Sequence, residues 1–463
     1  MHPPHRVGNS RRASTSIPTV GFAAAVRAGH AAHNALHRRC CPTERSPERE
    51  HADLAVVSNT SHARPRSASI RHPLILSSHF NDPARVREEL AMTLRQRAAV
   101  QPPEALIMAG SWPGDDIEKA VRSMLPYNTV VLSGGEIDRL VKDEVTGELR
   151  TPGPLDGPAH RRNWVVGVTG AVRRHLGLPI RYRDEGLKYW HFFARRPQWG
   201  GKLTEKDVPE LDYPTFAKED WQVVRRVLDE AGRADTKFQV AIPTGYAIGV
   251  FSGPFVISEA FTQKLESEVR DMFRGPDALD PLRTVIQVDL PAEMITFAMA
   301  TPLFRPRFGQ WVRQTLQRLI VAAPEGTSFA LHLCWGDLHA SALPAWRSVK
   351  AMVQFTNILV RDWPATWPLL YVIMPFVAGK RLAPVRAWRY RWLKQLRLPT
   401  DTLLVAGILH KRQSAERARK VWAAPRSCYG GRMAVGPECG CGRCTLNEAL
   451  YIFEQGERLL HPA

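Results

Sequence analysis

The sequence predicts an α/β protein built as a single (β/α)8 TIM barrel, and three observations support this prediction. Eight short apolar runs alternate with longer amphipathic segments, and strands that alternate with helices typically form a parallel sheet. Unusual polar residues follow the apolar runs directly, which is where barrel enzymes place their active sites. No G-x-G-x-x-G motif follows the first run, and this disfavours the alternative, a doubly wound open sheet that binds a dinucleotide.

The apolar runs and the segments between them give the expected elements in order. The runs expected to form strands are 105–109, 129–132, 238–242, 285–288, 328–334, 369–374, 403–409 and 432–435. The segments expected to be helical are 116–124, 163–176, 258–273, 308–321, 345–359, 385–396, 414–422 and 446–459. The long gap at 140–236 is expected to hold an insertion after the second strand.

The N-terminal part of the chain has a different composition. Residues 1–72 are rich in Arg, His, Ser and Pro, carry no acidic residue before Glu44 and show no lasting apolar periodicity. This composition predicts a disordered basic tail, followed by the barrel domain at 73–463. A weak basic helix at 20–35 would suit a transit peptide, but a mis-assigned upstream start would leave the same signature, so both interpretations stay open.

Charge and cysteine usage limit the class of partner and the compartment. The net charge is +18, but much of the excess lies in the tail and in solvated-looking segments, and no nucleic-acid-binding module accompanies it, so no nucleic-acid partner is expected. No apolar run approaches the roughly 20 residues that span a bilayer, so no membrane partner is expected either. Seven cysteines, three of them within 439–444, indicate metal or reactive thiols in a reducing compartment, here the cytoplasm.

A split set of cysteine and histidine residues is the strongest functional signal. His332 and Cys334 lie two residues apart on a predicted strand, so their side chains point to the same side of it. A third ligand, Cys439, comes from a distant loop. A His/Cys/Cys set with one open coordination position is typical of a catalytic Zn²⁺ site. Cys441 is a lesser candidate ligand, and the C-x-C-x2-C pattern of 439–444 could alone contribute to a small structural zinc site.

Two carboxylates are expected at the mouth of the barrel. Glu136 follows the second run and Asp289 closes the fourth. At the carboxyl ends of strands, such groups can bind a substrate ammonium group or transfer a proton, so both are candidate catalytic residues. The simpler interpretation of each, taken singly, is an exposed acid in a loop.

Five short motifs, taken in order, resemble the catalytic barrel of cobalamin-independent methionine synthase and, more loosely, its larger superfamily with uroporphyrinogen decarboxylase. The resemblance covers about 106–463. The motifs are Gly110-Ser111-Trp112-Pro113, Gly135-Glu136, Gln287-Val288-Asp289-Leu290-Pro291-Ala292, the pair His332 and Cys334, and Pro437-Glu438-Cys439-Gly440.

The resemblance implies a zinc-dependent methyl transfer in methionine biosynthesis. Zinc held by His332, Cys334 and Cys439 would activate a homocysteine-like thiol, which would attack the methyl group of a methyltetrahydrofolate-like donor. The substrate-binding residues would be Glu136, Asp289 and Ser111.

The sequence departs from the family in two ways that keep alternatives open. The chain is too short for the family's additional N-terminal barrel, and the run 369–374 with its exit 375–378 offers no carboxylate for the family's glutamate ligand. The fourth coordination position would therefore go to Cys441, to another residue or to solvent. The alternative functions are a non-catalytic zinc-binding barrel and a metal-free, decarboxylase-like or lyase-like enzyme on the same fold.

Overall fold

The computed structural model describes 101–113, 116–127, 129, 131–133, 141–142, 149–150, 168, 172, 175, 204–252, 258–335, 349–377, 382–442 and 444–461. These residues all belong to one compact unit, Val100–Ala463. The predicted tail and its boundary at residue 72 lie outside the described residues. No helix in the described part of the chain is long and apolar enough to cross a membrane.

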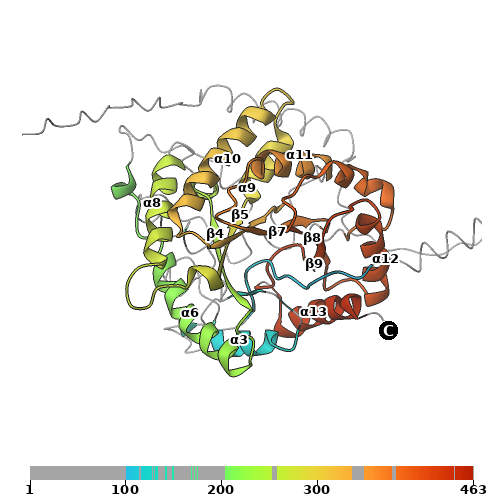
Figure 1. Ribbon diagram of the computed structural model, residues 1–463, viewed down its shortest axis with the longest axis horizontal. Coiled ribbons are helices and arrows are strands. Elements are labelled where there is room, and N and C mark those ends of the chain that lie inside the picture. Colours follow the sequence, from blue (N-terminus) through green and yellow to red (C-terminus); the bar gives the residue numbers. More distant parts are fainter. Residues whose placement is uncertain are drawn as a thin grey trace, which may run out of the picture. The chain divides into compact units, whose positions relative to one another are not determined.

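Seven parallel strands form one sheet at the centre of this unit (Figure 1). Their order in the sheet is β1-β4-β5-β6-β7-β8-β9. The strands are β1 Val131–Ser133, β4 Lys237–Pro243, β5 Thr284–Asp289, β6 Ser328–His332, β7 Leu369–Pro375, β8 Leu403–Leu409 and β9 Met433–Pro437. Each corresponds to a predicted run, so the parallel α/β architecture is confirmed and is consistent with a TIM-barrel-like fold.

The first predicted run, 105–109, contacts both edges of this sheet without forming a named strand. Leu106 makes isolated parallel bridges to Thr129, just before β1, and to Val435 on β9. Ile107 N donates to Val435 O (2.9 Å), and Val435 N donates to Ala105 O (3.0 Å). The two strands that end the sheet order are therefore both next to this segment.

Helices lie around the strands (Figure 1). They are α3 Ile117–Met124, α6 Tyr213–Glu230, α7 Gly245–Ser252, α8 Ser258–Met272, α9 Pro291–Met299, α10 Arg305–Ala322, α11 Val349–Leu359, α12 Ala415–Arg426 and α13 Leu446–Leu460. The expected insertion region contains a two-stranded pair, β2 Val141–Lys142 and β3 Leu149–Arg150, and also α6. The predicted helix at 163–176 lies mostly outside the described residues.

The expected helix at 385–396 is present, but two short helices were not predicted. The segment 385–396 contains a 3-10 helix, η6 Ala387–Gln395. The buried residues Tyr390 and Leu393 of this helix and Leu396 at its C-cap recur every third position, which matches the three residues per turn of a 3-10 helix. The helices α7 and α9 have no clear amphipathic pattern in the sequence, because both are short, largely apolar and follow a strand almost directly.

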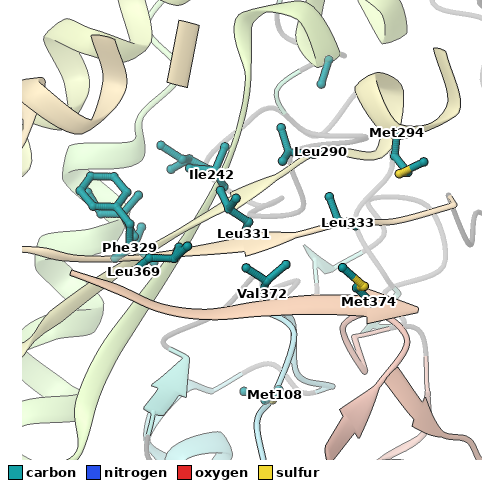
Figure 2. Packing of buried hydrophobic residues seen from close by; sticks show 14 of the residues in the cluster. Met108, Ile242, Leu290, Met294, Phe329, Leu331, Leu333, Leu369, Val372 and Met374 are labelled. Atoms are coloured by element: carbon teal, nitrogen blue, oxygen red, sulfur yellow. The ribbon is translucent and has the colours of Figure 1, made fainter. Parts of the chain in front are cut away.

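The two faces of the sheet carry separate apolar clusters. Figure 2 shows part of the larger cluster. In it, Phe329 and Leu331 project from β6, and Leu333 projects from the residue that follows β6. The opposite, inner face holds a small cluster that includes Ala330 and Tyr371. This alternation follows from the two-residue period of a strand, and it places His332 and Cys334 on the inner face with Ala330.

The inner face is strongly concave. The Tyr371 hydroxyl on β7 lies 2.6 Å from the Gln239 amide on β4. These strands are three positions apart in the sheet, which would be roughly 14 Å if the sheet were flat. The sheet must curl for the two side chains to meet, as it does in a barrel.

Candidate metal centre

Three predicted zinc ligands come together at the carboxyl ends of two strands. His332 is the last residue of β6, Cys334 follows it by two, and Cys439 follows β9 by two. One ligand atom from each residue lies within 4.8 Å of the others, and the two Sγ atoms are 3.9 Å apart. His332 and Cys334 are buried, and Cys439 is half-buried.

The donor set fits a zinc ion. Thiolate sulfur and imidazole nitrogen are the ligands that Zn²⁺ prefers. Two sulfurs at the usual Zn–S distance in tetrahedral geometry would be roughly 3.8 Å apart, close to the observed separation of the Cys334 and Cys439 sulfurs of 3.9 Å. Small adjustments of the side chains would therefore be enough to hold the ion.

The loop that carries Cys439 is held against the segment after the first apolar run. Cys441 N donates to Ser111 O (2.7 Å), and Gly442 N donates to Ser111 Oγ (3.1 Å). Gly440 makes this approach possible, because a Cβ atom there would lie only 2.7 Å from Ser111 N. The absence of a side chain at Gly440 thus helps to place Cys439 opposite His332.

A carboxylate fixes the orientation of the imidazole. Asp289 at the end of β5 is the register neighbour of His332, and its Oδ1 lies 2.9 Å from His332 Nδ1. The other ring nitrogen, Nε2, lies 3.2 Å from the carbonyl oxygen of Glu438, next to Cys439. With Nδ1 engaged by Asp289, Nε2 is the nitrogen directed toward the cysteine loop, and a metal-binding histidine is commonly oriented by such a carboxylate.

The groups around His332 favour the charged form of its imidazole. Burial lowers the pKa of His332, but hydrogen bonds to Asp289 and Cys334, together with the attraction of their charges, outweigh it and raise this pKa well above its ordinary value. A metal ion at this ring would compete with a proton for it.

The remaining predicted site residues are placed differently. Asp289 contacts the imidazole, as described. Ser111 packs against the cysteine loop. Cys441 is buried in the larger apolar cluster, and it is not in the group of converging ligand atoms found among the described residues. Glu136 lies outside the described residues.

Sequence reasoning did not identify several buried polar residues near the site. Gln239 and Tyr371 lie on the inner face without any predicted role, and Gln287 appeared only as part of a motif. Glu293, in the first turn of α9, is fully buried. Burial, opposed by a hydrogen bond from Thr244, raises the pKa of Glu293 to about 7. The position of Gln239 could have been noticed in the sequence, because it is a polar residue within an apolar run. Side chains alternate along a strand, and Gln239 belongs to the set that faces the interior.

Comparisons with known proteins give distant structural similarity only. No family model and no curated protein matches the sequence. A B12-independent methionine synthase from Shewanella sp. W3-18-1, solved in complex with selenomethionine, has a TM-score of 0.41 and 11% identity over 78% of this chain and 98% of its own. A candidate vitamin-B12-independent methionine synthase from Listeria monocytogenes has a TM-score of 0.32 and 13% identity over 52% of this chain and 69% of its own. At these similarities, function has to be inferred from the residues of the site.

Proposed function

We propose that this protein is a zinc-dependent methyltransferase that methylates a small, homocysteine-like thiol using a methyltetrahydrofolate-like donor. The observation that carries the proposal is the convergence of His332, Cys334 and Cys439 on the inner face of the sheet. Three protein ligands leave a coordination position for a substrate, as in catalytic rather than structural zinc sites. The five motifs that resemble methionine synthase support the same reaction.

Zinc, when bound, would supply Lewis acidity that lowers the pKa of a coordinated thiol. The chain's own residues would set the geometry around it. Asp289 orients the His332 ring, and the contacts of Ser111 with the cysteine loop place Cys439. In the transfer, a bond forms between the substrate sulfur and the methyl carbon, while the bond from that carbon to the donor nitrogen breaks and its electron pair stays on the nitrogen. Glu136 and Asp289 are proposed to bind the amino acid part of the substrate, with Ser111 beside them.

We propose further that the sheet closes as an eight-stranded barrel, with 105–109 as its first strand. Its support is the pair of bridges from Leu106 to Thr129 and Val435. In a closed barrel, His332, Cys334 and Cys439 would all lie at the carboxyl-terminal mouth, the usual position of barrel active sites. The proposed compartment is the cytoplasm, where thiols stay reduced.

Metal analysis combined with a methylation assay tests the function. The purified protein should contain about one zinc per chain, and Cys334→Ser and Cys439→Ser should each lose most of it. Cys428→Ser is the matched control, because the Cys428 sulfur instead donates to the carbonyl oxygen of Ala387 and zinc should be retained. Methylation of homocysteine by methyltetrahydrofolate should depend on that zinc.

The same measurements separate the alternatives. Stoichiometric zinc without methylation of any small thiol would favour a non-catalytic zinc-binding barrel. Absence of zinc from protein that was purified without chelators would instead favour a metal-free enzyme of the decarboxylase or lyase type.

A further inference from the structure

A chain of buried polar side chains extends from His332 across the inner face of the sheet. Asp289 Oδ1, which contacts His332 Nδ1, also accepts a hydrogen bond from Gln287 Nε2 (2.9 Å). Gln287 Oε1 lies 3.2 Å from the Gln239 amide, which lies 2.6 Å from the Tyr371 hydroxyl. We call these five residues the polar array.

The polar array lies in a buried part of the sheet where apolar side chains would be expected to pack. Gln239, Gln287 and Tyr371 have no exposed surface, and their neighbours on the inner face form a cluster of Ala, Val, Ile and Leu side chains. Burying polar groups costs free energy unless they are hydrogen-bonded to one another. A connected set of buried polar side chains that ends on a candidate metal ligand therefore suggests a role beyond packing.

The contacts at Asp289 Oδ1 show what that role could be. This oxygen accepts a hydrogen bond from Nε2 of Gln287, on the same strand. It also lies within hydrogen-bond distance of Nδ1 of His332, on the next strand. Two donors from different strands hold the carboxylate at one position and in one rotamer. If an ion takes the place of the Nε2 proton, the carboxylate so held keeps the remaining ring proton on Nδ1, and the ring would bind the ion through Nε2, the nitrogen that lies toward Glu438 and the cysteine loop.

We propose that Gln287, with Gln239 and Tyr371 behind it, is a positioning residue for the metal centre. Gln287 anchors Asp289, and Asp289 in turn selects the His332 tautomer that presents Nε2 to the ion. This inference rests on the proposed zinc site. A cavity-filling role would instead require only the volume of these side chains and not their hydrogen bonds.

Zinc affinity and a cobalt spectrum test the inference without any assay of activity. The variant Gln287→Leu keeps much of the side-chain volume and removes the donor. Outer-sphere partners of metal ligands typically contribute about 10–100-fold to metal affinity, so we expect a loss of this size in chelator competition. We also expect a shifted ligand-field spectrum of the Co²⁺-loaded protein. Tyr371→Phe, at the far end of the polar array, should cause a smaller loss.

Gln413→Leu is the matched control for a buried glutamine. Gln413 is buried and donates through Nε2 to the carbonyl oxygen of Ile408 (2.7 Å), outside the polar array. Its substitution should leave zinc affinity and the Co²⁺ spectrum unchanged. If Gln287→Leu fails to fold, Gln287→Met, which has a similar length and volume and no hydrogen-bond donor, should weaken zinc binding as much.

The outcomes distinguish the inference from the proposed function. A parent protein that binds zinc through His332 and Cys334, but whose affinity and Co²⁺ spectrum are unchanged in Gln287→Leu or Gln287→Met, would overturn the inference and leave the proposed function standing. An equal loss in Gln413→Leu would overturn it as well, because the effect would then be general to buried glutamines. A parent protein that binds no zinc would overturn both.

Discussion

Replacing Glu293 by Gln should change how stability depends on pH. Glu293 is fully buried, and its Oε1 accepts from the Thr244 hydroxyl, whereas its Oε2 has no hydrogen-bond partner among the described residues. Burial is the main cause that raises the pKa of Glu293 from 4.5 to about 7. Between these values the folded protein keeps a proton that the unfolded chain has released, so the free energy of unfolding falls as pH rises through this window.

The size of the effect follows from the shift. The pKa of Glu293 differs by about 2.5 between the unfolded and the folded protein, which corresponds to about 3 kcal/mol. The free energy of unfolding is lowered by this full amount only above pH 7. Glutamine is uncharged and close in shape to the protonated acid, and its amide oxygen can accept from the Thr244 hydroxyl as Glu293 Oε1 does. We therefore expect Glu293→Gln to match the parent near pH 4.5 and to be more stable at pH 8 by up to about 3 kcal/mol.

Urea denaturation of parent and variant at both pH values measures this difference. Glu325→Gln is the control, because Glu325 is exposed and its substitution changes the net charge by the same amount. The reasoning would be refuted if Glu293→Gln were no more stable than the parent at pH 8, or if its advantage were the same at both pH values.

Three further predictions concern the metal centre. Gly440→Ala should destabilise the cysteine loop by roughly 1–3 kcal/mol and speed zinc loss, because its Cβ would lie 2.7 Å from Ser111 N, whereas Gly430→Ala, where a Cβ meets nothing within 4 Å, should be neutral. Zinc affinity in chelator competition should fall as pH is lowered from 8 to 6, because the ion displaces a proton from His332 and from the thiols; a pH-independent affinity would argue against these ligands. His332→Ala should release most of the zinc from folded protein, and full retention would rule out this imidazole as a ligand.

Periodicity and strand-end position were enough to predict much of the fold and the ligand set. Each of the six strands β4 to β9 is a continuous run of buried residues or close to it, and such runs are typical of parallel strands covered on both faces. His332 and Cys334 share a face because they are two residues apart, and this holds for any strand. Their meeting with Cys439 requires that parallel strands end at the same edge of the sheet and also that the sheet curls, because β6 and β9 are three positions apart; the expected barrel supplies both conditions.

The polar array could not be predicted, because it depends on how far the sheet curls. Gln239 and Tyr371 are far apart in sequence and three strands apart in the sheet, and no local pattern indicates that their side chains meet. Glu293 was missed for a related reason. An acidic residue in the first turn of a helix normally lies at the surface, where it favours the helix dipole, and only the packing of α9 shows that this one is buried.

The charges around the centre suggest why Asp289 is held so firmly. In the described part of β7 and its exit, Leu369–Pro375 and then 376–377, no residue carries a carboxylate, so no fourth anionic ligand comes from the strand that follows β6. Two thiolates and a neutral imidazole would balance the charge of Zn²⁺ and leave it more Lewis acidic than a site with an added carboxylate. Asp289 then supplies negative charge one hydrogen bond behind His332, where it strengthens the imidazole as a ligand without occupying the position that a thiol substrate needs.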